Sequence, residues 1–442
     1  MLKTNVLIIR WSQVRILAGP PATQTSNACA LGPSELPIIL LYPIDRTLSA
    51  LSANLVGVDD EARRRGRAPS RNSRRAYLFK LTSLTLSIIV PEKSKPENWR
   101  ATTAGVSNVK AFILQRPGRA SIEVVPDPVV RPGEILLQVR MVGFCGSDLN
   151  SFRGLNPLAF YPRILGHEVS ATVVKGDTEI APGTDVAVFP YTNCGRCAAC
   201  RRGRPNACQY NETLGVQRDG ALAEYIAMPR EKLYRARLTP KELCLVEPLT
   251  VGFHAVARGR VTAEDNVAIF GCGGVGLGAV AAASCRGART ICVDVNDEKL
   301  ELARITGGGE IINSVREPLH QRLLELTDGR GPDAVIEAVG TPGTFRAAVE
   351  EVAFTGRVVY IGYAKEPVSY ETRLFVQKEL DVLGSRNAQP EDFLAAIGLL
   401  EARKFPVDQA VSLTVGLSEA PDALRSWSEN PSCFQKIQVC LD

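Results

Sequence analysis

Short apolar runs separated by glycine and proline follow one another from Val109 to about residue 250. Lys110-Ala111-Phe112 opens this pattern, and the turn-rich segment 126–133 interrupts it. Alternating or continuous apolar residues predict strands at Ala120–Val125, Glu134–Val142, Val169–Val174 and Val186–Phe189. The pattern therefore predicts an irregular, mainly β region.

Apolar strands alternate with helical stretches in the next part of the chain. Strands are predicted at Val267–Phe270, Thr290–Val293, Asp333–Ala338 and Arg357–Gly362, and helices at Glu317–Leu326 and Thr344–Val352. Alternation of this kind is typical of a parallel, doubly wound sheet. From about Ser385 the chain returns to a helix, Pro390–Arg403, and a last strand, Gln435–Leu441.

Residues 1–108 show no sustained period of 2 or 3.6, and arginine clusters interrupt their short apolar pieces. This segment carries 15 Lys and Arg against 7 Asp and Glu, a net charge of +8, whereas the rest carries 37 against 40, a net charge of −3. The overall charge of +5 therefore gives no support for nucleic-acid binding by the main body. An organellar transit peptide is one interpretation of this segment, but Asp59-Asp60-Glu61 counts against it.

We favour a second interpretation, in which residues 1–108 are a non-native or disordered extension. Val14-Arg15-Ile16-Leu17, followed by Gly19-Pro20-Pro21, is the peptide expected from translating the T-arm and CCA end of a transfer-RNA gene. Val109 fits a GTG start codon, so the natural protein is expected to start near it. The N-terminal peptide of the natively expressed protein, found by mass spectrometry, would test this, and a peptide spanning residues 40–100 would contradict it.

Twelve cysteines do not indicate secretion here. Four of them lie within fifteen residues at metal-ligand spacing, and no leading segment has the layout of a signal peptide. The apolar runs Leu36–Leu41 and Leu84–Val90 are far shorter than the roughly 20 residues that a membrane helix needs. We expect a cytoplasmic protein in a reduced compartment, with no membrane and no nucleic-acid partner.

The strongest local motif is Cys194-x2-Cys197-x2-Cys200-x7-Cys208. Four thiolates at this spacing can close a tetrahedron around one zinc and leave no position for substrate, which predicts a structural zinc site. Four unrelated buried cysteines are a poor alternative, because free cysteines rarely cluster outside metal or redox sites. A nucleic-acid-binding zinc ribbon is favoured by the neighbouring arginines, but ribbons usually carry two separated cysteine pairs.

A glycine loop, Gly271-Cys272-Gly273-Gly274-Val275-Gly276, follows the predicted strand Val267–Phe270 and precedes an alanine-rich helix. The next strand ends in Asp294, eighteen residues after Gly276. In this context the motif is a dinucleotide-binding fingerprint, in which the loop admits the pyrophosphate to a helix N-terminus and the acid binds the ribose hydroxyls. Because a carboxylate repels a 2′-phosphate, NAD is expected rather than NADP.

The chain has three histidines, and one lies in Gly166-His167-Glu168, twenty-two residues after Cys145. A thiolate, an imidazole and a carboxylate are ligands that zinc prefers, and a catalytic zinc keeps one position open. Glu247 stands in an apolar run, where a buried charge needs a partner such as a metal. We predict a catalytic zinc held by Cys145, His167 and Glu168 or Glu247, with the choice of glutamate left open. His254 is interpreted as a structural helix residue and His320 as a solvated one.

In this order and spacing the motifs resemble those of the zinc-dependent medium-chain dehydrogenases, most closely the polyol branch of sorbitol, galactitol and sugar-acid dehydrogenases. The resemblance runs from Val109 to Asp442 and also rests on Gly143–Asp148, Val246-Glu247-Pro248-Leu249 and Gly384-Ser385-Arg386-Asn387. It implies an α/β fold with a GroES-like β-rich catalytic domain, residues 109–250 with 386–442 returning to it. It also implies a Rossmann domain with a doubly wound parallel sheet, residues 251–385.

The resemblance further implies roles for single residues. The thiolate–imidazole–carboxylate trio binds the catalytic zinc, while Glu247 ligates the metal directly or holds its water. Ser147 passes the substrate proton onward, and Arg386 lies near the active site on the substrate side. The four-cysteine lobe often lies near subunit contacts in this family, so a homo-oligomer, dimer or tetramer, is expected by analogy.

The expected reaction is the reversible oxidation of a secondary alcohol, a polyol or sugar acid, with hydride transfer to NAD. Many family members have a histidine five residues after the zinc cysteine, but this chain has Asn150, whose amide cannot exchange a proton near neutral pH. The proton must leave through Ser147, the ribose hydroxyls, water, or Glu168 and Glu247. Two alternatives stay open: a dehydrogenase of a 3-hydroxy amino acid such as threonine, and a catalytically silent NAD-binding regulator.

Overall fold

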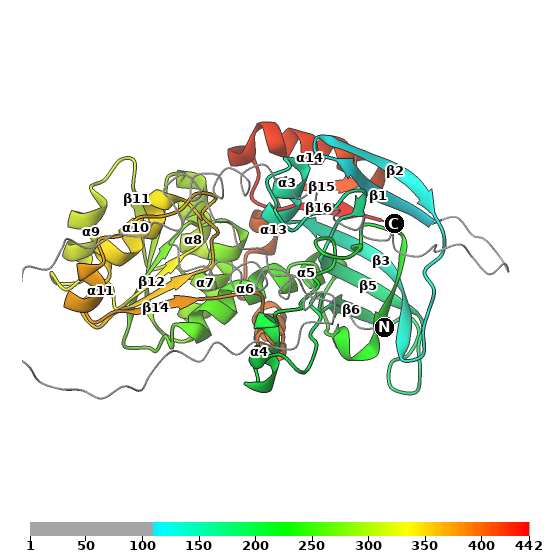
Figure 1. Ribbon diagram of the computed structural model, residues 1–442, viewed down its shortest axis with the longest axis horizontal. Coiled ribbons are helices and arrows are strands. Elements are labelled where there is room, and N and C mark those ends of the chain that lie inside the picture. Colours follow the sequence, from blue (N-terminus) through cyan, green and yellow to red (C-terminus); the bar gives the residue numbers. More distant parts are fainter. Residues whose placement is uncertain (1–108, 442) are drawn as a thin grey trace, which may run out of the picture. The chain divides into compact units, whose positions relative to one another are not determined.

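The computed structural model describes residues 109–441, so the predictions made for residues 1–108 lie outside the described residues. Within residues 109–441 the predicted strands and helices are all present, with ends displaced by at most two residues. The strands form a three-stranded, a six-stranded and a seven-stranded sheet (Figure 1). The last two carry the residues of interest.

The six-stranded sheet is wholly parallel and is built from continuous apolar strands. Its order is β11 (Glu310–Asn313), β10 (Arg289–Asp294), β9 (Asn266–Phe270), β12 (Ala334–Glu337), β13 (Arg357–Tyr360) and β14 (Asp381–Gly384). The helices of this part are α7 (Gly274–Cys285), α8 (Asp297–Ile305), α9 (Leu319–Leu326), α10 (Pro342–Glu351) and α11 (Arg373–Gln377). The strand order reverses beside β9, and the carboxyl ends at such a switch point are where open α/β sheets bind ligands.

The seven-stranded sheet combines the start and the end of the described chain. Its order is β15 (Leu413–Gly416), β16 (Ile437–Cys440), β3 (Glu134–Phe144), β5 (Glu168–Lys175), β6 (Asp185–Val188) and β8 (Leu233–Arg235), and β7 (Tyr225–Pro229) also pairs with β3. β16 runs antiparallel to β3, so the red C-terminal strands lie beside early strands in Figure 1. The predicted return of the C-terminal segment is therefore present.

The three-stranded sheet has the order β2 (Arg119–Val125), β1 (Val109–Arg116) and β4 (Arg163–Ile164). The remaining α-helices are α3 (Gly146–Phe152), α4 (Ala198–Arg201), α5 (Pro240–Leu243), α6 (Val246–Arg258), α12 (Pro390–Glu401), α13 (Val407–Ala410) and α14 (Ala420–Glu429). Short 3-10 helices are η2 (Pro205–Ala207), η3 (Arg230–Lys232), η4 (Leu417–Glu419) and η5 (Pro431–Cys433). The predicted domain boundary after residue 250 falls inside α6, and both boundaries stay predictions.

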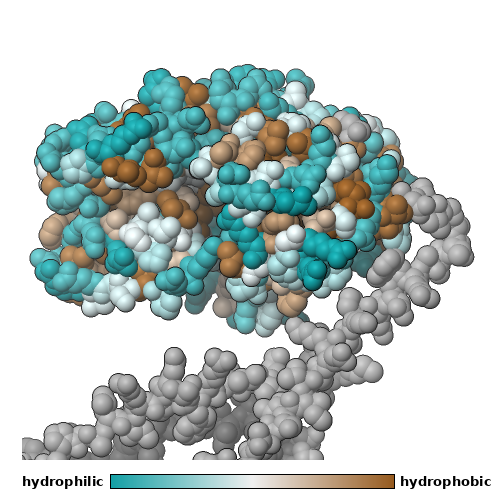
Figure 2. Space-filling view, turned by 90° about the horizontal axis from the view of Figure 1, so that it is seen from above, coloured by the Kyte–Doolittle hydropathy of each residue, from teal (hydrophilic) through white to brown (hydrophobic). Residues whose placement is uncertain are grey.

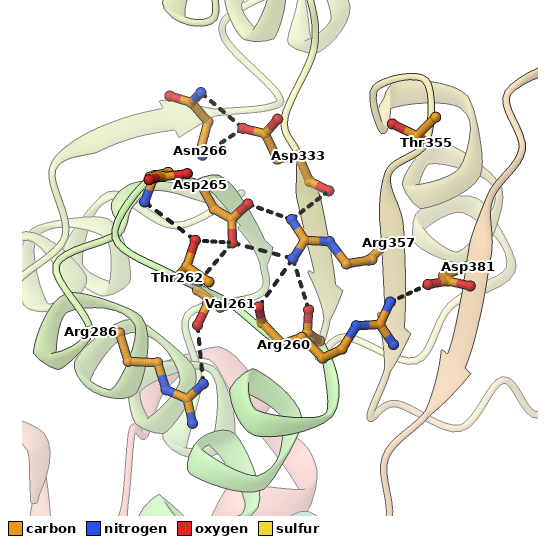
Figure 3. A network of polar contacts seen from close by, with 12 residues as sticks. Arg260, Val261, Thr262, Asp265, Asn266, Arg286, Asp333, Thr355, Arg357 and Asp381 are labelled. Atoms are coloured by element: carbon orange, nitrogen blue, oxygen red, sulfur yellow. Dashed lines mark hydrogen bonds and ion pairs between the residues drawn. The ribbon is translucent and has the colours of Figure 1, made fainter.

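A polar network ties together the amino ends of the parallel strands (Figure 3). The guanidinium of Arg357, at the start of β13, forms an ion pair with Asp265 and donates to the Gly259 carbonyl oxygen at 3.1 Å. Asp333, just before β12, accepts a hydrogen bond from the backbone N–H of Asn266 at 2.8 Å. These contacts hold together the amino ends of the parallel strands. The carboxyl ends, on the opposite side of the sheet, take no part in this network.

Among residues 109–441, none of the helices has both the length and the apolar character needed to cross a bilayer. The face shown in Figure 2 is a mosaic of hydrophilic and hydrophobic residues, in which the hydrophobic ones form scattered groups.

Candidate active site

Cys145 lies at the junction between a strand and a helix. β3 ends at Phe144 and α3 begins at Gly146, so Cys145 is the extended N-cap residue, with φ −104° and ψ 160°. Its backbone N–H donates to Asp148 Oδ2 at 2.9 Å, and Asp148 is buried. This local capping arrangement holds the thiol at the end of the sheet.

Two glycines make room for the neighbouring residues, His167 and Glu168. Gly143 pairs across the strands with Glu168, and a Cβ atom at Gly143 would lie 2.0 Å from Glu168 Oε2. Gly166 has φ +97°, and its Cβ would lie 2.6 Å from Val142 Cγ1. A larger residue at Gly143 would displace the Glu168 carboxylate, and one at Gly166 would collide with Val142 and strain the backbone beside His167.

The predicted catalytic trio converges in space. One ligand atom each from Cys145, His167 and Glu168 lie within 4.8 Å of one another, and Glu247 is not part of this group. Ser147 Oγ, Asp148 Oδ1 and His167 Nδ1 are buried there without a hydrogen-bond partner. His167 Nδ1 and Asp148 Oδ1 face each other as an ion pair at 4.0 Å, which leaves Ser147 Oγ without a partner. A thiolate, an imidazole and a carboxylate fit a zinc ion, and the free hydroxyl suits a polar ligand.

Lys436, on the C-terminal side of the chain, completes this cluster, and the sequence motifs did not predict it. Its ammonium donates to Glu168 Oε1 and Oε2 at 2.6 and 2.7 Å and to the Phe144 carbonyl oxygen at 3.2 Å. The pairing of β16 with β3 brings it there, 268 residues after Glu168. The ion pair means that the Glu168 carboxylate is held in place before any metal binds.

Burial and neighbouring charges shift the pKa of Glu168, His167 and Lys436. Burial raises the pKa of Glu168 to about 7, while Lys436 opposes the rise. Burial would lower the pKa of His167, but Asp148, Cys145 and Glu247 together raise it well above its usual value. An imidazole that attracts a proton this strongly lies in a negative environment, which also attracts a metal cation.

Glu247 lies in the first turn of α6 and is 5% exposed. The hydroxyl of Tyr191 donates a hydrogen bond to Glu247 Oε1. Burial, followed by the charge of Glu247, raises the pKa of Tyr191 well above its usual value, so the phenol stays protonated. From the sequence, a metal is expected as the partner of this buried carboxylate. The structure shows that Tyr191, which the sequence motifs did not single out, is also a partner.

The four cysteines of the lobe also converge, with Cys194, Cys197, Cys200 and Cys208 sulfur atoms all within 4.8 Å of one another. Cys208 Sγ accepts backbone N–H groups from Cys194 and Tyr210, each at 3.3 Å. Backbone N–H groups of Cys200 and Gln209 lower the pKa of Cys197 to about 6. Burial raises the pKa of Cys200 to about 11, so the electrostatics of the lobe differ from one thiol to the next. The convergence of the four sulfur atoms is what fits a closed zinc site.

A buried hydrogen-bond chain links this lobe to helices α6 and α12. Asn206 donates to His254 Nε2 at 2.9 Å, and His254 Nδ1 lies 2.9 Å from Asp392 Oδ2. His254 is 2% exposed, which confirms its structural interpretation. Arg386 donates to the Cys208 carbonyl oxygen at 3.3 Å, so its recorded contact is with the lobe, and its role toward substrate stays a prediction. His320 has a side chain 69% exposed, as expected.

The glycine loop has the close contacts that a dinucleotide cradle requires. Gly271 has φ +93°, and a Cβ at Gly276 would lie 1.8 Å from the Gly271 carbonyl oxygen. Asp294 Oδ2 accepts the backbone N–H of Cys272 at 2.8 Å, which ties the end of β10 to the loop. A Cβ at Gly274 would lie 3.7 Å from Lys436 Nζ, so one ammonium lies beside both the loop and Glu168.

Two family models match the chain. The model described as alcohol dehydrogenase GroES-like domain matches residues 131–238, and the model described as zinc-binding dehydrogenase matches residues 274–402. An uncharacterised zinc-type alcohol dehydrogenase-like protein of Haemophilus influenzae is 34% identical, over 75% of this chain and 98% of its own.

Named enzymes match at similar levels. The sorbitol dehydrogenase of Bacillus subtilis is 34% identical over 68% of this chain and 90% of its own, and the L-galactonate-5-dehydrogenase of Escherichia coli is 30% identical over 70% and 92%. The L-threonine 3-dehydrogenase of Bacillus licheniformis is 33% identical over 69% and 91%.

Solved structures share the fold. An alcohol dehydrogenase of Escherichia coli in complex with NADH has a TM-score of 0.70 and 27% identity, over 76% of this chain and 100% of its own. A zinc-binding dehydrogenase of Sinorhizobium meliloti bound to NADP has a TM-score of 0.70 and 30% identity, over the same shares of the two chains.

Proposed function

Because this chain belongs to the zinc-dependent medium-chain dehydrogenase family, we propose that it oxidises a secondary alcohol of a polyol or sugar acid, with NAD as hydride acceptor. The proposal carries over to this chain the substrate class that the names of the sorbitol and L-galactonate dehydrogenases indicate. The single observation that carries it is the position of Lys436, whose ammonium binds Glu168 and lies beside Gly274. Metal cluster and dinucleotide loop are therefore adjacent, as hydride transfer between a bound alcohol and NAD requires.

We assign the catalytic zinc to Cys145, His167 and Glu168, whose ligand atoms already lie together. When bound, zinc supplies a Lewis acid that lowers the pKa of a bound alcohol, and NAD accepts the hydride. Glu247 contributes a second carboxylate at the site, held through Oε1 by Tyr191. We assign the structural zinc to the four cysteines of the lobe.

Ser147 is the group that receives the substrate proton in this proposal. Its Oγ is buried without a partner, so it can accept a hydrogen bond from a substrate hydroxyl and donate its own proton onward. Asn150 follows one turn later on α3. Its amide can form hydrogen bonds but cannot take up a proton near neutral pH. The proton therefore leaves through water, the ribose hydroxyls or a carboxylate.

We infer two further properties. The thiolate-rich lobe requires reduced cysteines, which is the state kept in a cytoplasmic compartment. A homo-oligomer is supported by the edge strand β14, whose Val382 is 46% exposed. An exposed edge strand with apolar side chains is suited to pairing with a second copy.

Zinc content and NADH production test the function together. The purified chain is expected to hold two zinc ions and to reduce NAD with members of a panel of sugar alcohols, aldonic acids and threonine. Turnover of threonine alone would favour the 3-hydroxy amino acid alternative. Bound zinc and NADH with no turnover on any alcohol would favour the silent regulator.

Cys145→Ser is the matched variant for this test. It is expected to hold one zinc fewer and to lose turnover, while its fold and its NADH affinity are unchanged, because the thiolate serves the metal and not the core. Cys285→Ser, which changes an exposed cysteine, is the control. Wild-type turnover in a Cys145→Ser protein with one zinc fewer would contradict the assignment.

A further inference from the structure

We propose that Tyr191 is a positioning residue for Glu247, holding this carboxylate in its working orientation. The inference rests on the proposed function, since it gives Tyr191 a part in the same reaction. It goes further because Tyr191 belongs to no metal or nucleotide motif and lies in the loop that leads into the four-cysteine lobe.

The contact is buried at both ends. Tyr191 is 3% exposed and Glu247 is 5% exposed, and the phenol donates to Glu247 Oε1. A carboxylate buried to this degree is costly unless hydrogen bonds or charges compensate it. The bond uses Oε1, so it restrains rotation of the carboxylate and keeps Oε2 for water, substrate or metal.

The aromatic ring of Tyr191 is itself fixed by its neighbours. Its edge packs against Phe189, with ring centroids 5.2 Å apart and an interplanar angle of 86°. Phe189 in turn packs against Phe393 of α12 at 4.9 Å and stacks on Tyr234 at 6.2 Å. The ring cannot swing without disturbing this cluster, so the hydroxyl is directed at Glu247 before substrate binds.

The backbone on either side of Tyr191 is also held. The Pro190 carbonyl oxygen accepts the N–H of Leu214 at 3.1 Å, and Thr192 Oγ1 accepts the N–H of Glu212 at 2.7 Å. Two residues after Thr192 the chain enters the lobe at Cys194. The fixed loop therefore connects the four-cysteine lobe with the active site. Through this loop the position of the lobe affects the position of Tyr191, and thereby that of the Glu247 carboxylate.

Helix α6, which carries Glu247, also holds this residue in place. It lies in the first turn of α6, where the helix dipole favours a negative charge, and its carbonyl oxygen accepts Thr250 Oγ1 at 2.6 Å. The thiol of Cys244, three residues before Glu247, donates to the Glu168 carbonyl oxygen at 3.3 Å, so the start of α6 lies against the strand that carries Glu168. A small rotation of this carboxylate would change the environment of the reacting atoms.

Tyr191→Phe removes the hydroxyl and keeps the ring. Loss of a hydrogen bond to a charged group predicts a fall of about 10- to 100-fold in kcat/KM, mainly in kcat. The Kd for NADH should stay within about twofold, since the hydroxyl of Tyr191 donates to Glu247 and its ring, which the variant keeps, packs on Phe189. Tyr234→Phe is the matched control, because it removes a hydroxyl from the same aromatic cluster.

A double-mutant cycle with Glu247→Gln separates positioning from a structural role. If Tyr191 acts through Glu247, adding Tyr191→Phe to Glu247→Gln should lower kcat/KM by less than about threefold. An equal loss in both backgrounds, or wild-type kcat/KM in Tyr191→Phe, would overturn the proposal. If the wild type is active and Tyr191→Phe has the same kcat/KM, the role of Tyr191 is contradicted but the proposed function is not.

Cobalt placed at the catalytic site tests the inference without turnover. The visible absorption of the Co²⁺ protein should shift in Tyr191→Phe and not in Tyr234→Phe, because only the first frees Glu247. Identical spectra in wild type and Tyr191→Phe would overturn the proposal. Absence of turnover by the wild type contradicts the proposed function instead, and the cobalt spectra then decide the role of Tyr191.

Discussion

Lys436 and Glu168 form an ion pair shielded from solvent, with side-chain exposures of 9% and 0%. The ion pair mainly holds the two side chains in place, because buried ion pairs add little stability but are costly to break. The same reasoning applies to Tyr191 and Glu247, where a buried carboxylate has a phenol as its partner. At the scale of the residue, buried hydrogen-bond and ion-pair partners orient the two carboxylates of the site.

Lys436→Met should destabilise the protein strongly, because it leaves the Glu168 carboxylate buried without its counter-ion. We expect the free energy of unfolding to fall by about 3 to 5 kcal/mol. Adding Glu168→Gln should recover part of the loss, since the uncompensated charge is then gone. Urea unfolding measures both, with the exposed Lys404→Met as control. Equal stability of Lys436→Met and Lys404→Met would contradict the prediction.

Asp294→Ala should relax the preference for NAD. The carboxylate at the end of β10 repels a 2′-phosphate, and its removal should lower the NAD to NADP ratio of kcat/KM by about tenfold or more. NADH affinity should also fall, because Asp294 Oδ2 holds the Cys272 N–H of the loop. Steady-state kinetics with both cofactors measure the ratio, and Asp328→Ala is an exposed control. An unchanged ratio would count against the ribose contact.

The ends of helices and strands carry the chemistry at the scale of the element. Cys145 caps α3, Glu247 lies in the first turn of α6, and Gly274 begins α7. Free backbone N–H groups at these ends favour anions, which suits a thiolate, a carboxylate and a pyrophosphate respectively. The opposite ends of the parallel strands are closed by the network around Arg357 (Figure 3).

Asp265→Asn should weaken that network in a pH-dependent way. Burial opposes ionisation of Asp265, but Arg357 and Thr262 lower its pKa below 3.8 overall. A lowered folded-state pKa contributes stability at pH values above 3.8, and this contribution is lost as the pH falls through the folded-state pKa.

The wild type should therefore exceed Asp265→Asn by about 1.5 to 3 kcal/mol at pH 7. The gap should shrink on acidification below pH 3.8. Urea unfolding at several pH values, with EDTA in every sample, measures it. A gap that is constant with pH would contradict the assignment to this ion pair.

Cys200→Ser should destabilise the lobe before it affects chemistry. A closed zinc site contributes directly to folding, so its loss should lower Tm by about 5 °C or more and impair assembly. Zinc content should fall by one ion per chain, and NADH binding should persist. Thermal unfolding and metal analysis measure this, against the exposed Cys285→Ser. Wild-type Tm in a protein with one zinc fewer would show that the site is not structural.

At the scale of the whole molecule, residues far apart in sequence join the metal cluster, the lobe and the parallel sheet. The Asn206–His254–Asp392 chain connects the lobe with α6 and α12, and Lys436 lies beside both Glu168 and Gly274. Helix α6 carries both Glu247 and His254, so metal site and lobe share one rigid element. Contacts of this kind connect the four-cysteine lobe with the helix that carries Glu247.

Val382→Asp should disrupt the proposed homo-oligomer. A charge on the exposed edge strand β14 opposes edge-to-edge pairing, which requires apolar side chains to be buried. We expect smaller particles by light scattering coupled to size-exclusion chromatography, with the helical content unchanged. Val315→Asp is the control, since Val315 is 73% exposed away from this edge strand. An oligomer of unchanged mass would exclude β14 from the interface.

Local patterns alone predicted the parallel α/β sheet, the four-cysteine site, the glycine loop and the pair Cys145 and His167. The choice between Glu168 and Glu247 stayed open, and the GroES-like domain was implied by the family resemblance. Strand and helix periods repeat within a few residues, and metal or nucleotide motifs have their spacing imposed by short-range geometry. These features can be recognised before the chain folds. The comparisons with known proteins agree with the family that those motifs indicate.

Only the tertiary structure decided which partner each buried charge has. Lys436 reaches Glu168 across 268 residues because β16 pairs with β3 and β3 with β5 in one register. Tyr191 reaches Glu247 across 56 residues through the packing of an aromatic cluster. A hydrogen bond forms within about 3 Å, and no sequence spacing specifies that distance between segments whose contact depends on strand register and side-chain packing.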